Sequence, residues 1–299
     1  MKSALSFVAL AGLASIASAV VPTVNIGNFV LNGDFVAAGG SSRTSSGVPN
    51  PFDIAMPGIS GAEVRSYAVW NTLTNTPFDS SESIITINGN RIVAVGANAA
   101  TPDLCWGYEY TATYWADVTG LLVHGGNNTI FAGDTGTGAL GEGVSLLTVY
   151  SDAAMPLQNI DIFWNGVPGQ IANNLVDGEN RWNFSNPYMG GPAHGFTNAL
   201  DGQLGSDDFY INGGLASGLY GTFAPFDAWI GNVGPYYDHA EGDFSPFMAF
   251  GETFMDIGTP FLDSDCIGHT FGAIAFVIPA PGTFALAGMG VLALARRRR

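Results

Sequence analysis

Short stretches of apolar residues that alternate with polar ones run through the middle of the chain and are typical of β-strands. In the first half they are Val64–Trp70, Ser83–Asn88, Arg91–Val95, Tyr108–Val118, Val144–Tyr150 and Ile160–Trp164. In the second half they are Asp208–Asn212, Leu215–Phe223, Trp229–Val233, Phe247–Phe254 and Thr270–Ile278. The pair Asn88-Gly89 lies between two of them and predicts a two-residue hairpin. Because no amphipathic helix of convincing length interrupts this pattern, we predict an all-β, jelly-roll-like sandwich.

The segment Pro168–Pro192 separates the two groups of strands, since it is rich in Asn, Gly and Pro and has no clear period. It predicts one β-sandwich lobe over residues 20–167 and a second, packed lobe over residues 168–278. The alternative is one large sandwich, in which residues 168–278 continue the first part after a long crossover.

The N-terminal residues 1–19 have the pattern of a signal peptide. Lys2 is followed by the apolar run Ala4–Ile16, and Ala17-Ser18-Ala19 provides the small residues of an A-x-A cleavage site. We therefore expect the mature chain to begin near Val20.

The C-terminal residues 279–299 form a short apolar segment with a basic end. Pro279 and Pro281 interrupt any helix from upstream, and Thr283–Ala295 carries no charge. A helix over that run is about 20 Å long, shorter than the roughly 30 Å of a bilayer core. The basic end, which should stay on the cytoplasmic side of a membrane, consists of Arg296, Arg297, Arg298 and Arg299. An ordinary, slightly short membrane anchor is one interpretation of this segment.

The order of Pro-x-Pro, short apolar helix and terminal arginines also resembles the PEP-CTERM signal that exosortase-type enzymes handle in Gram-negative bacteria. This family usually has Glu between the prolines, where this chain has Ala280. The resemblance implies a temporary anchor in the inner membrane, which the sorting enzyme cuts near Pro279–Pro281. The rest of the chain would then be attached to the outer surface or released.

The residues between the two end segments, here called the body, are strongly acidic. They hold all 25 acidic residues against four arginines and no lysine, and so a net charge of −21. Such a surface repels nucleic acid and anionic lipid, which excludes both as partners. The hydrophobic fraction of the whole chain, 47%, is high enough to fill a core and excludes a disordered chain.

Cys105 and Cys266 are the two cysteines of the chain. In an exported protein such a pair predicts a disulfide rather than a metal or catalytic site. The alternative is two buried free thiols.

Several strand-and-turn segments of the body resemble the DUF3344-type family of bacterial extracellular β-domains, which occur in secreted and adhesin-like proteins. The segments are Gly33–Gly39, Arg65–Trp70, Ile84–Asn90, Trp115–Thr119, Gly143–Tyr150, Ile160–Gly166 and Asp265-Cys266. The resemblance implies a non-enzymatic surface protein, and it assigns no functional residues.

Two groups of residues are candidates for binding. Acidic loops can build irregular Ca²⁺ sites, and the candidate ligands are Asp238, Glu241, Asp243, Asp263 and Asp265. An EF-hand at Asp263 is excluded because Ile267 and Ile274 stand where oxygen ligands are required. The second group is aromatic and could stack on sugars; it comprises Trp229, Tyr236, Tyr237 and Phe244.

No catalytic motif emerges from the remaining residues. His124, His194, His239 and His269 are scattered without metal-ligand spacing, and no G-x-S-x-G motif is present. We therefore predict an exported structural or adhesive protein of the cell surface or matrix that is not an enzyme. Its expected partners are the sorting enzyme and exopolysaccharide or other surface proteins. The alternatives are a Ca²⁺-dependent carbohydrate-binding module and a secreted hydrolase.

Overall fold

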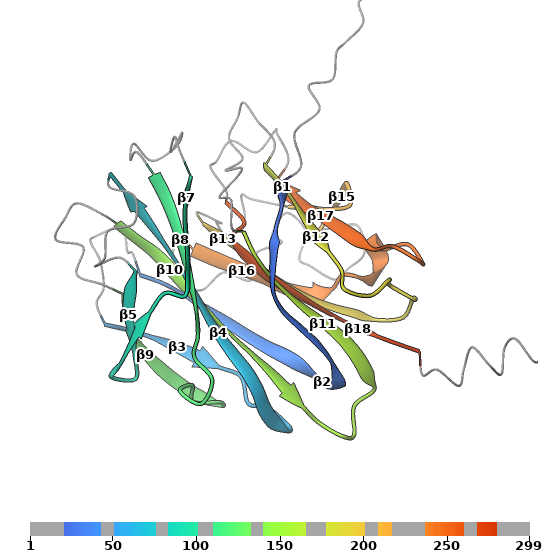
Figure 1. The fold of residues 1–299 in the computed structure, drawn as a ribbon, viewed down its shortest axis with the longest axis horizontal. Coiled ribbons are helices and arrows are strands. Elements are labelled where there is room, and N and C mark those ends of the chain that lie inside the picture. The colour runs from blue at the N-terminus through green and yellow to red at the C-terminus, as the bar shows by residue number, and fades with distance from the viewer. Residues whose placement is uncertain are drawn as a thin grey trace, which may run out of the picture.

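A computed structural model describes the chain in nine ranges, which are residues 21–42, 51–75, 83–100, 110–132, 140–165, 178–200, 209–216, 237–259 and 268–279. Within these ranges nearly all regular structure is β-strand, and the helical residues are one 3₁₀ turn, Ser245–Phe247. The strands form large, packed and mainly antiparallel sheets (Figure 1). The predicted all-β sandwich is confirmed.

One long strand, β2 (Val24–Ser41), organises the sheets. Its first half pairs with β11 (Leu157–Trp164), up to the pair Asn32–Leu157. Its second half pairs with β10 (Leu140–Ser151), beginning at the pair Gly33–Ser151. β2 therefore joins two groups of strands into one nine-stranded sheet.

The nine-stranded sheet has the order β16-β13-β18-β11-β2-β10-β4-β8-β7. On the side of β11 its strands are β16 (Tyr237–Asp243), β13 (Ala193–Leu200) and β18 (Phe271–Val277). On the side of β10 they are β4 (Ala62–Thr74), β8 (Tyr110–Asp117) and β7 (Gly96–Ala100). Strands from both sides of residue 167 thus lie side by side in this sheet.

Two smaller sheets cover it. The four-stranded sheet has the order β3 (Phe52–Met56), β9 (Gly126–Ala132), β5 (Ile84–Ile87) and β6 (Asn90–Val93). The five-stranded sheet has the order β1 (Val21–Pro22), β12 (Gly178–Asn183), β17 (Phe254–Thr259), β14 (Tyr210–Ile211) and β15 (Gly214–Leu215).

Three apolar cores show how these sheets are stacked. One core joins β4, β8 and β10 to the four-stranded sheet, and another joins β11, β13 and β18 to the five-stranded sheet. The third core brings Val69 and Leu147 together with Phe196 and Ala273, which come from strands on opposite sides of β2 in the nine-stranded order. A flat sheet would hold these strands far apart, so the sheet folds over on itself along β2 and buries both faces (Figure 1).

The local sequence predictions are confirmed where apolar alternation is strong. β4, β10 and β11 contain the expected strands, and β8 and β18 lie within theirs. The Asn88-Gly89 hairpin is also present, because β5 pairs with β6 and both turn residues have positive φ, 51° and 79°.

Two predictions for the second half are wrong. The expected strand Phe247–Phe254 is instead the end of the 3₁₀ turn and a loop with Gly251 at φ 88°, and β17 begins only at Phe254. The acidic segment Asp238–Asp243, expected to be a loop, lies within β16 and pairs with β13. Tyr237 and Ala240 are both fully buried although they lie on opposite faces of this strand, so β16 is covered on both sides there and shows no apolar–polar alternation.

Candidate functional site

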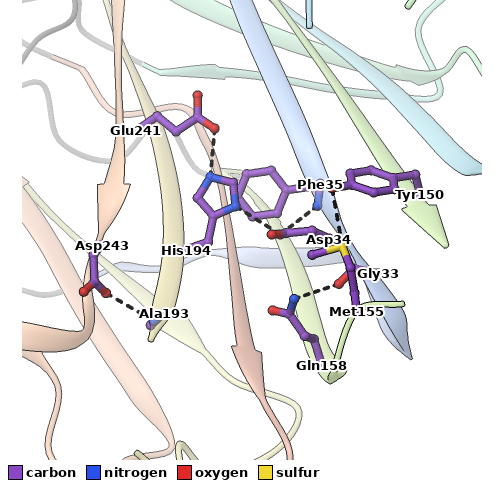
Figure 2. A network of polar contacts seen from close by, with 10 residues as sticks. All are labelled: Gly33, Asp34, Phe35, Tyr150, Met155, Gln158, Ala193, His194, Glu241 and Asp243. Atoms are coloured by element: carbon purple, nitrogen blue, oxygen red, sulfur yellow. Dashed lines mark hydrogen bonds and ion pairs between the residues drawn. The ribbon is translucent and has the colours of Figure 1, made fainter. Parts of the chain in front are cut away.

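A histidine held between two carboxylates lies where β2, β13 and β16 meet (Figure 2). The Nδ1 of His194 on β13 lies 3.0 Å from an Oδ1 of Asp34 on β2. Its Nε2 lies 2.8 Å from an Oε1 of Glu241 on β16. Asp34 directly follows Gly33, where β2 changes its partner strand, so the change of partner places this carboxylate.

The surroundings of His194 favour its charged form. The imidazole ring stacks on Phe35 with a centroid distance of 4.2 Å and an interplanar angle of 6°. Burial alone lowers the pKa of His194, but the hydrogen bonds and charges of Asp34 and Glu241 outweigh it and raise the pKa to about 9. At neutral pH the ring is therefore an imidazolium that donates one N–H to each carboxylate.

This geometry fits an ionic link better than a catalytic centre. In the imidazolium form that this raised pKa favours, both ring nitrogens carry protons and neither offers the lone pair that a metal ion requires. A group with a pKa of about 9 is also protonated at neutral pH and is a poor general base there. The three side chains are 17–30% exposed, so the link lies at the rim of the central core and ties three strands together.

Neighbouring polar contacts hold the backbone around this link (Figure 2). Gln158 donates from Nε2 to the carbonyl of Gly33 at 2.8 Å. The carboxylate of Asp243 accepts the backbone N–H groups of Ala193 and Ser245, at 3.2 Å and 2.9 Å. Asp243 thus fixes the chain where β16 turns into the 3₁₀ helix.

The predicted Ca²⁺ ligands within the described ranges do not form one site, because they take part in different contacts. Glu241 accepts from His194, Asp243 accepts from backbone amides, and Asp238 lies in β16. Asp263 and Asp265 lie outside the described residues. In the part of the chain that the structure describes, no group of three His, Cys, Asp or Glu side chains is arranged to hold a metal ion.

The predicted sugar-stacking group is only partly described. Tyr237 and Phe244 are fully buried, and the Tyr237 hydroxyl contacts Ser145 at 2.5 Å and Asn198 at 2.7 Å. Their rings face the protein interior, so we remove both from the candidate glycan surface. Trp229 and Tyr236 lie outside the described residues.

The cysteine pair and most of the processing residues also lie outside the described residues. They are Cys105, Cys266, Ala17, Ala19, Pro281 and Arg296–Arg299. Pro279 is described and lies two residues after the end of β18.

The other histidines have structural surroundings. His269 is buried, and this burial lowers its pKa to about 3. Burial also lowers the pKa of His239, and His124 lies 3.0 Å from the hydroxyl of Thr148. His269 contributes to a narrow recess between the nine-stranded and five-stranded sheets, together with Asn165, Asn180 and Trp182.

The site that sequence reasoning missed is the link between Asp34 and His194. These residues are 160 positions apart and belong to no motif. Asp34 lies next to Phe35, and His194 lies in the strand Ala193–Leu200. Nothing in the sequence around either residue indicates that the two side chains meet, because their contact depends on β2 changing its partner strand.

Comparison with known proteins identifies the C-terminal segment. The family model of the PEP-CTERM protein-sorting motif matches residues 277–299. This match confirms the predicted tail and leaves the resemblance of the body to DUF3344-type domains untested. No curated protein matches the chain.

One solved structure with a weak likeness is a β-porphyranase of glycoside hydrolase family 86 from the human gut bacterium Bacteroides plebeius. The sequence identity is 10% and the TM-score 0.28, over 76% of this chain and 34% of the enzyme chain. The chain thus spans 34% of that enzyme, and a likeness this weak carries no argument about function.

Among the described residues, no helix is long and apolar enough to cross a membrane. The C-terminal segment nevertheless carries the PEP-CTERM motif, which is typical of exported proteins that exosortase sorts to the surface.

Proposed function

We propose that the chain is a structural or adhesive protein of the bacterial surface or extracellular matrix and that it performs no catalysis. The observation that carries this proposal is the position of the sorting motif relative to the fold. The motif begins at Val277, which is the last residue of the core strand β18.

A cut near Pro279–Pro281 would leave the folded body complete. Directly after β18, the N–H of Ile278 still donates to the carbonyl of Leu157 at 3.0 Å. Pro279 has no N–H to continue the ladder, so the sheet ends where the tail begins. Processing would therefore separate a membrane-targeting tail from an intact sandwich.

The chemistry of the body supports a binding or scaffolding role. The titratable side chain of His194 is already hydrogen-bonded to Asp34 and Glu241. The acidic composition suits a soluble extracellular surface, and the resemblance to DUF3344-type domains points in the same direction. Exopolysaccharide or other surface proteins are the partners we propose.

Deleting the protein from its native cells tests this role. Cells without it should lose surface adhesion or matrix cohesion, and supplying the wild-type chain should restore both. The purified protein should release no products from a panel of matrix polysaccharides. Polysaccharide cleavage together with unchanged adhesion would contradict the proposal and favour the hydrolase alternative.

A further inference from the structure

A second polar cluster lies on one face of the β2–β11 pair, beneath the loop that follows β12. Its members are Asn25 and Asn28 of β2, Asn159 and Asp161 of β11, and Ser185 and Asn186 of the loop. Asn28 and Asp161 are direct partners in the strand register. Asn159 and Asp161 are fully buried, whereas Asn25, Asn28 and Ser185 are exposed. The cluster therefore has a buried floor and a rim that solvent reaches.

The floor holds a carboxylate with no cationic partner. Asp161 Oδ1 accepts from the amides of Asn25 and Asn28, at 2.8 Å and 2.9 Å. Its Oδ2 accepts from the amide of Asn159 at 2.6 Å and from the backbone N–H of Ser185 at 3.0 Å. No arginine or histidine in the described ranges forms an ion pair with it. Buried charges in proteins are normally paired or bound to a metal, because an unpaired one loses its hydration.

The cluster also has fewer protons than polar contacts. The Ser185 hydroxyl has one proton, yet its Oγ lies 2.8 Å from Asn159 Oδ1 and 3.0 Å from Asp161 Oδ2. The Asn28 amide has two protons for three oxygens, which are Asp161 Oδ1, Asn159 Oδ1 and Ser185 Oγ. Asn159 Oδ1 additionally accepts from Asn186 at 2.8 Å. The Ser185 hydroxyl and the Asn28 amide thus each contact one oxygen more than they have protons to donate, and oxygen atoms from three segments converge at this point.

We propose that this cluster is a Ca²⁺ site. Asp161, Asn159 and Ser185 provide carboxylate, amide and hydroxyl oxygens, and Asn28 adds its amide oxygen after a half-turn of its terminal group. Water entering over the exposed rim completes the six to eight oxygen ligands that Ca²⁺ takes. The donor set contains only oxygen, which disfavours zinc and copper, and its irregular arrangement suits Ca²⁺ better than the strictly octahedral Mg²⁺.

A cation here would stabilise the junction between two sheets. β2 and β11 belong to the nine-stranded sheet, and Ser185 lies just after β12 of the five-stranded sheet. Ca²⁺ bound between them would neutralise Asp161 and hold the loop after β12 against the nine-stranded sheet. This site does not depend on the proposed surface function and lies apart from the acidic residues Glu241 and Asp243.

Calcium titration of the full chain tests the proposal. Protein freed of metal with a chelator is titrated with CaCl₂ by calorimetry, and its Tm is followed in parallel. We expect a Ca²⁺ site with a Kd of about 10⁻³ M or lower, the range of extracellular modules. The Tm should rise with Ca²⁺ concentration and return after chelation, and Mg²⁺ at equal concentration should have a smaller effect. A Tm unchanged by Ca²⁺ up to about 10 mM would overturn the proposal.

Two variants locate the binding. Asp161→Asn should weaken Ca²⁺ binding at least tenfold, whereas the control Asp53→Asn should leave it unchanged. Asp53 is also a carboxylate of the sandwich, but it accepts from Thr129 within the four-stranded sheet. Binding that survives Asp161→Asn and disappears in Asp243→Asn would place the ion in the β16 region and refute the site.

A third variant covers the case that Asp161→Asn does not fold. Asn28→Asp adds a second carboxylate at the exposed rim, and affinity for Ca²⁺ rises with the charge of the ligands. We expect Ca²⁺ to bind about tenfold more tightly. Without Ca²⁺ the variant should have a lower Tm than the wild type, because two carboxylates then adjoin without a cation. Unchanged Ca²⁺ affinity in Asn28→Asp would contradict the proposal.

Discussion

The hydroxyl of Tyr237 lies 2.5 Å from the hydroxyl of Ser145, although their strands are five positions apart in the nine-stranded sheet. In a flat sheet, five steps between strands amount to roughly 24 Å. The contact therefore requires the sheet to fold over on itself, with β16 lying across β10. The third apolar core occupies the same interface.

Removing the Tyr237 hydroxyl tests how much this contact stabilises the fold. Tyr237→Phe leaves Ser145 and the Asn198 amide, which now lies 2.7 Å from that hydroxyl, without this partner. We expect the free energy of unfolding to fall by about 1–3 kcal/mol, measured by urea denaturation. In a double-mutant cycle with Ser145→Ala the two effects should be non-additive. Strictly additive effects would show that the hydroxyls do not interact.

Gly33 is the residue at which β2 changes its partner strand. A Cβ atom there would lie 2.0 Å from the backbone carbonyl oxygen of Tyr150, which cannot move without disturbing β10. Gly33→Ala should therefore lower stability by about 1–3 kcal/mol or more. Gly58→Ala is the control, since its Cβ would meet only the Cα of Gly125, at 3.9 Å. Equal Tm values for the two variants would contradict the close approach at Gly33.

The link of Asp34, His194 and Glu241 should weaken in alkali. The folded pKa of His194, about 9, lies above its ordinary value of 6.5, so the folded state binds the proton more tightly than the unfolded state. The stabilisation is complete below pH 6.5 and is lost as pH rises through 9. Between these limits we expect a loss on the order of 2–3 kcal/mol, measured by urea denaturation at several pH values. His194→Gln should remove this pH dependence, and a variant that keeps the wild-type slope would refute the assignment.

His269 should act in the opposite direction. Burial lowers its pKa from 6.5 to about 3, so the unfolded state binds the proton more tightly. Stability is complete above pH 6.5 and declines as pH falls towards 3, by about 1.4 kcal/mol per pH unit. NMR titration of the histidine side chains measures this directly. A His269 resonance that titrates near pH 6.5 in the folded protein would contradict its burial in the neutral form.

The strands that could be predicted from the sequence are those whose buried residues are apolar. β-Branched and aromatic residues make two of these strands recognisable in the sequence, Val144–Tyr150 and Ile160–Trp164. β13 and β16 do not, because both carry His, Asn, Asp or Gly at positions that contact other strands. The segment Phe247–Phe254 gave the opposite error, since Phe247 belongs to a 3₁₀ turn and Phe250 to a loop, and only Phe254 begins a strand.

The polar clusters could not be predicted from the sequence for a related reason. Asn159 and Asp161 alternate with Ile160 and Ile162, a pattern that normally indicates solvent-facing positions. Both are buried because the loop at Ser185 covers them, and that loop comes from another sheet. No local pattern contains such information, since it arises from how the sheets stack.

The arginine cluster of the tail offers a direct control on sorting. Replacing Arg296–Arg299 with alanine should remove the basic end that holds the tail at the cytoplasmic side. We expect unprocessed protein to accumulate, detected by western blotting of cell fractions. Normal processing of this variant would contradict a role for the arginines.

The intact mass and location of the native protein, measured in fractionated cells and medium, test the account most directly. A mass that lacks residues 1–19 and the segment after about Pro279–Pro281, found at the surface or in the medium, is the result we predict. A full C-terminus recovered in the membrane fraction would contradict it and would make the tail an ordinary anchor.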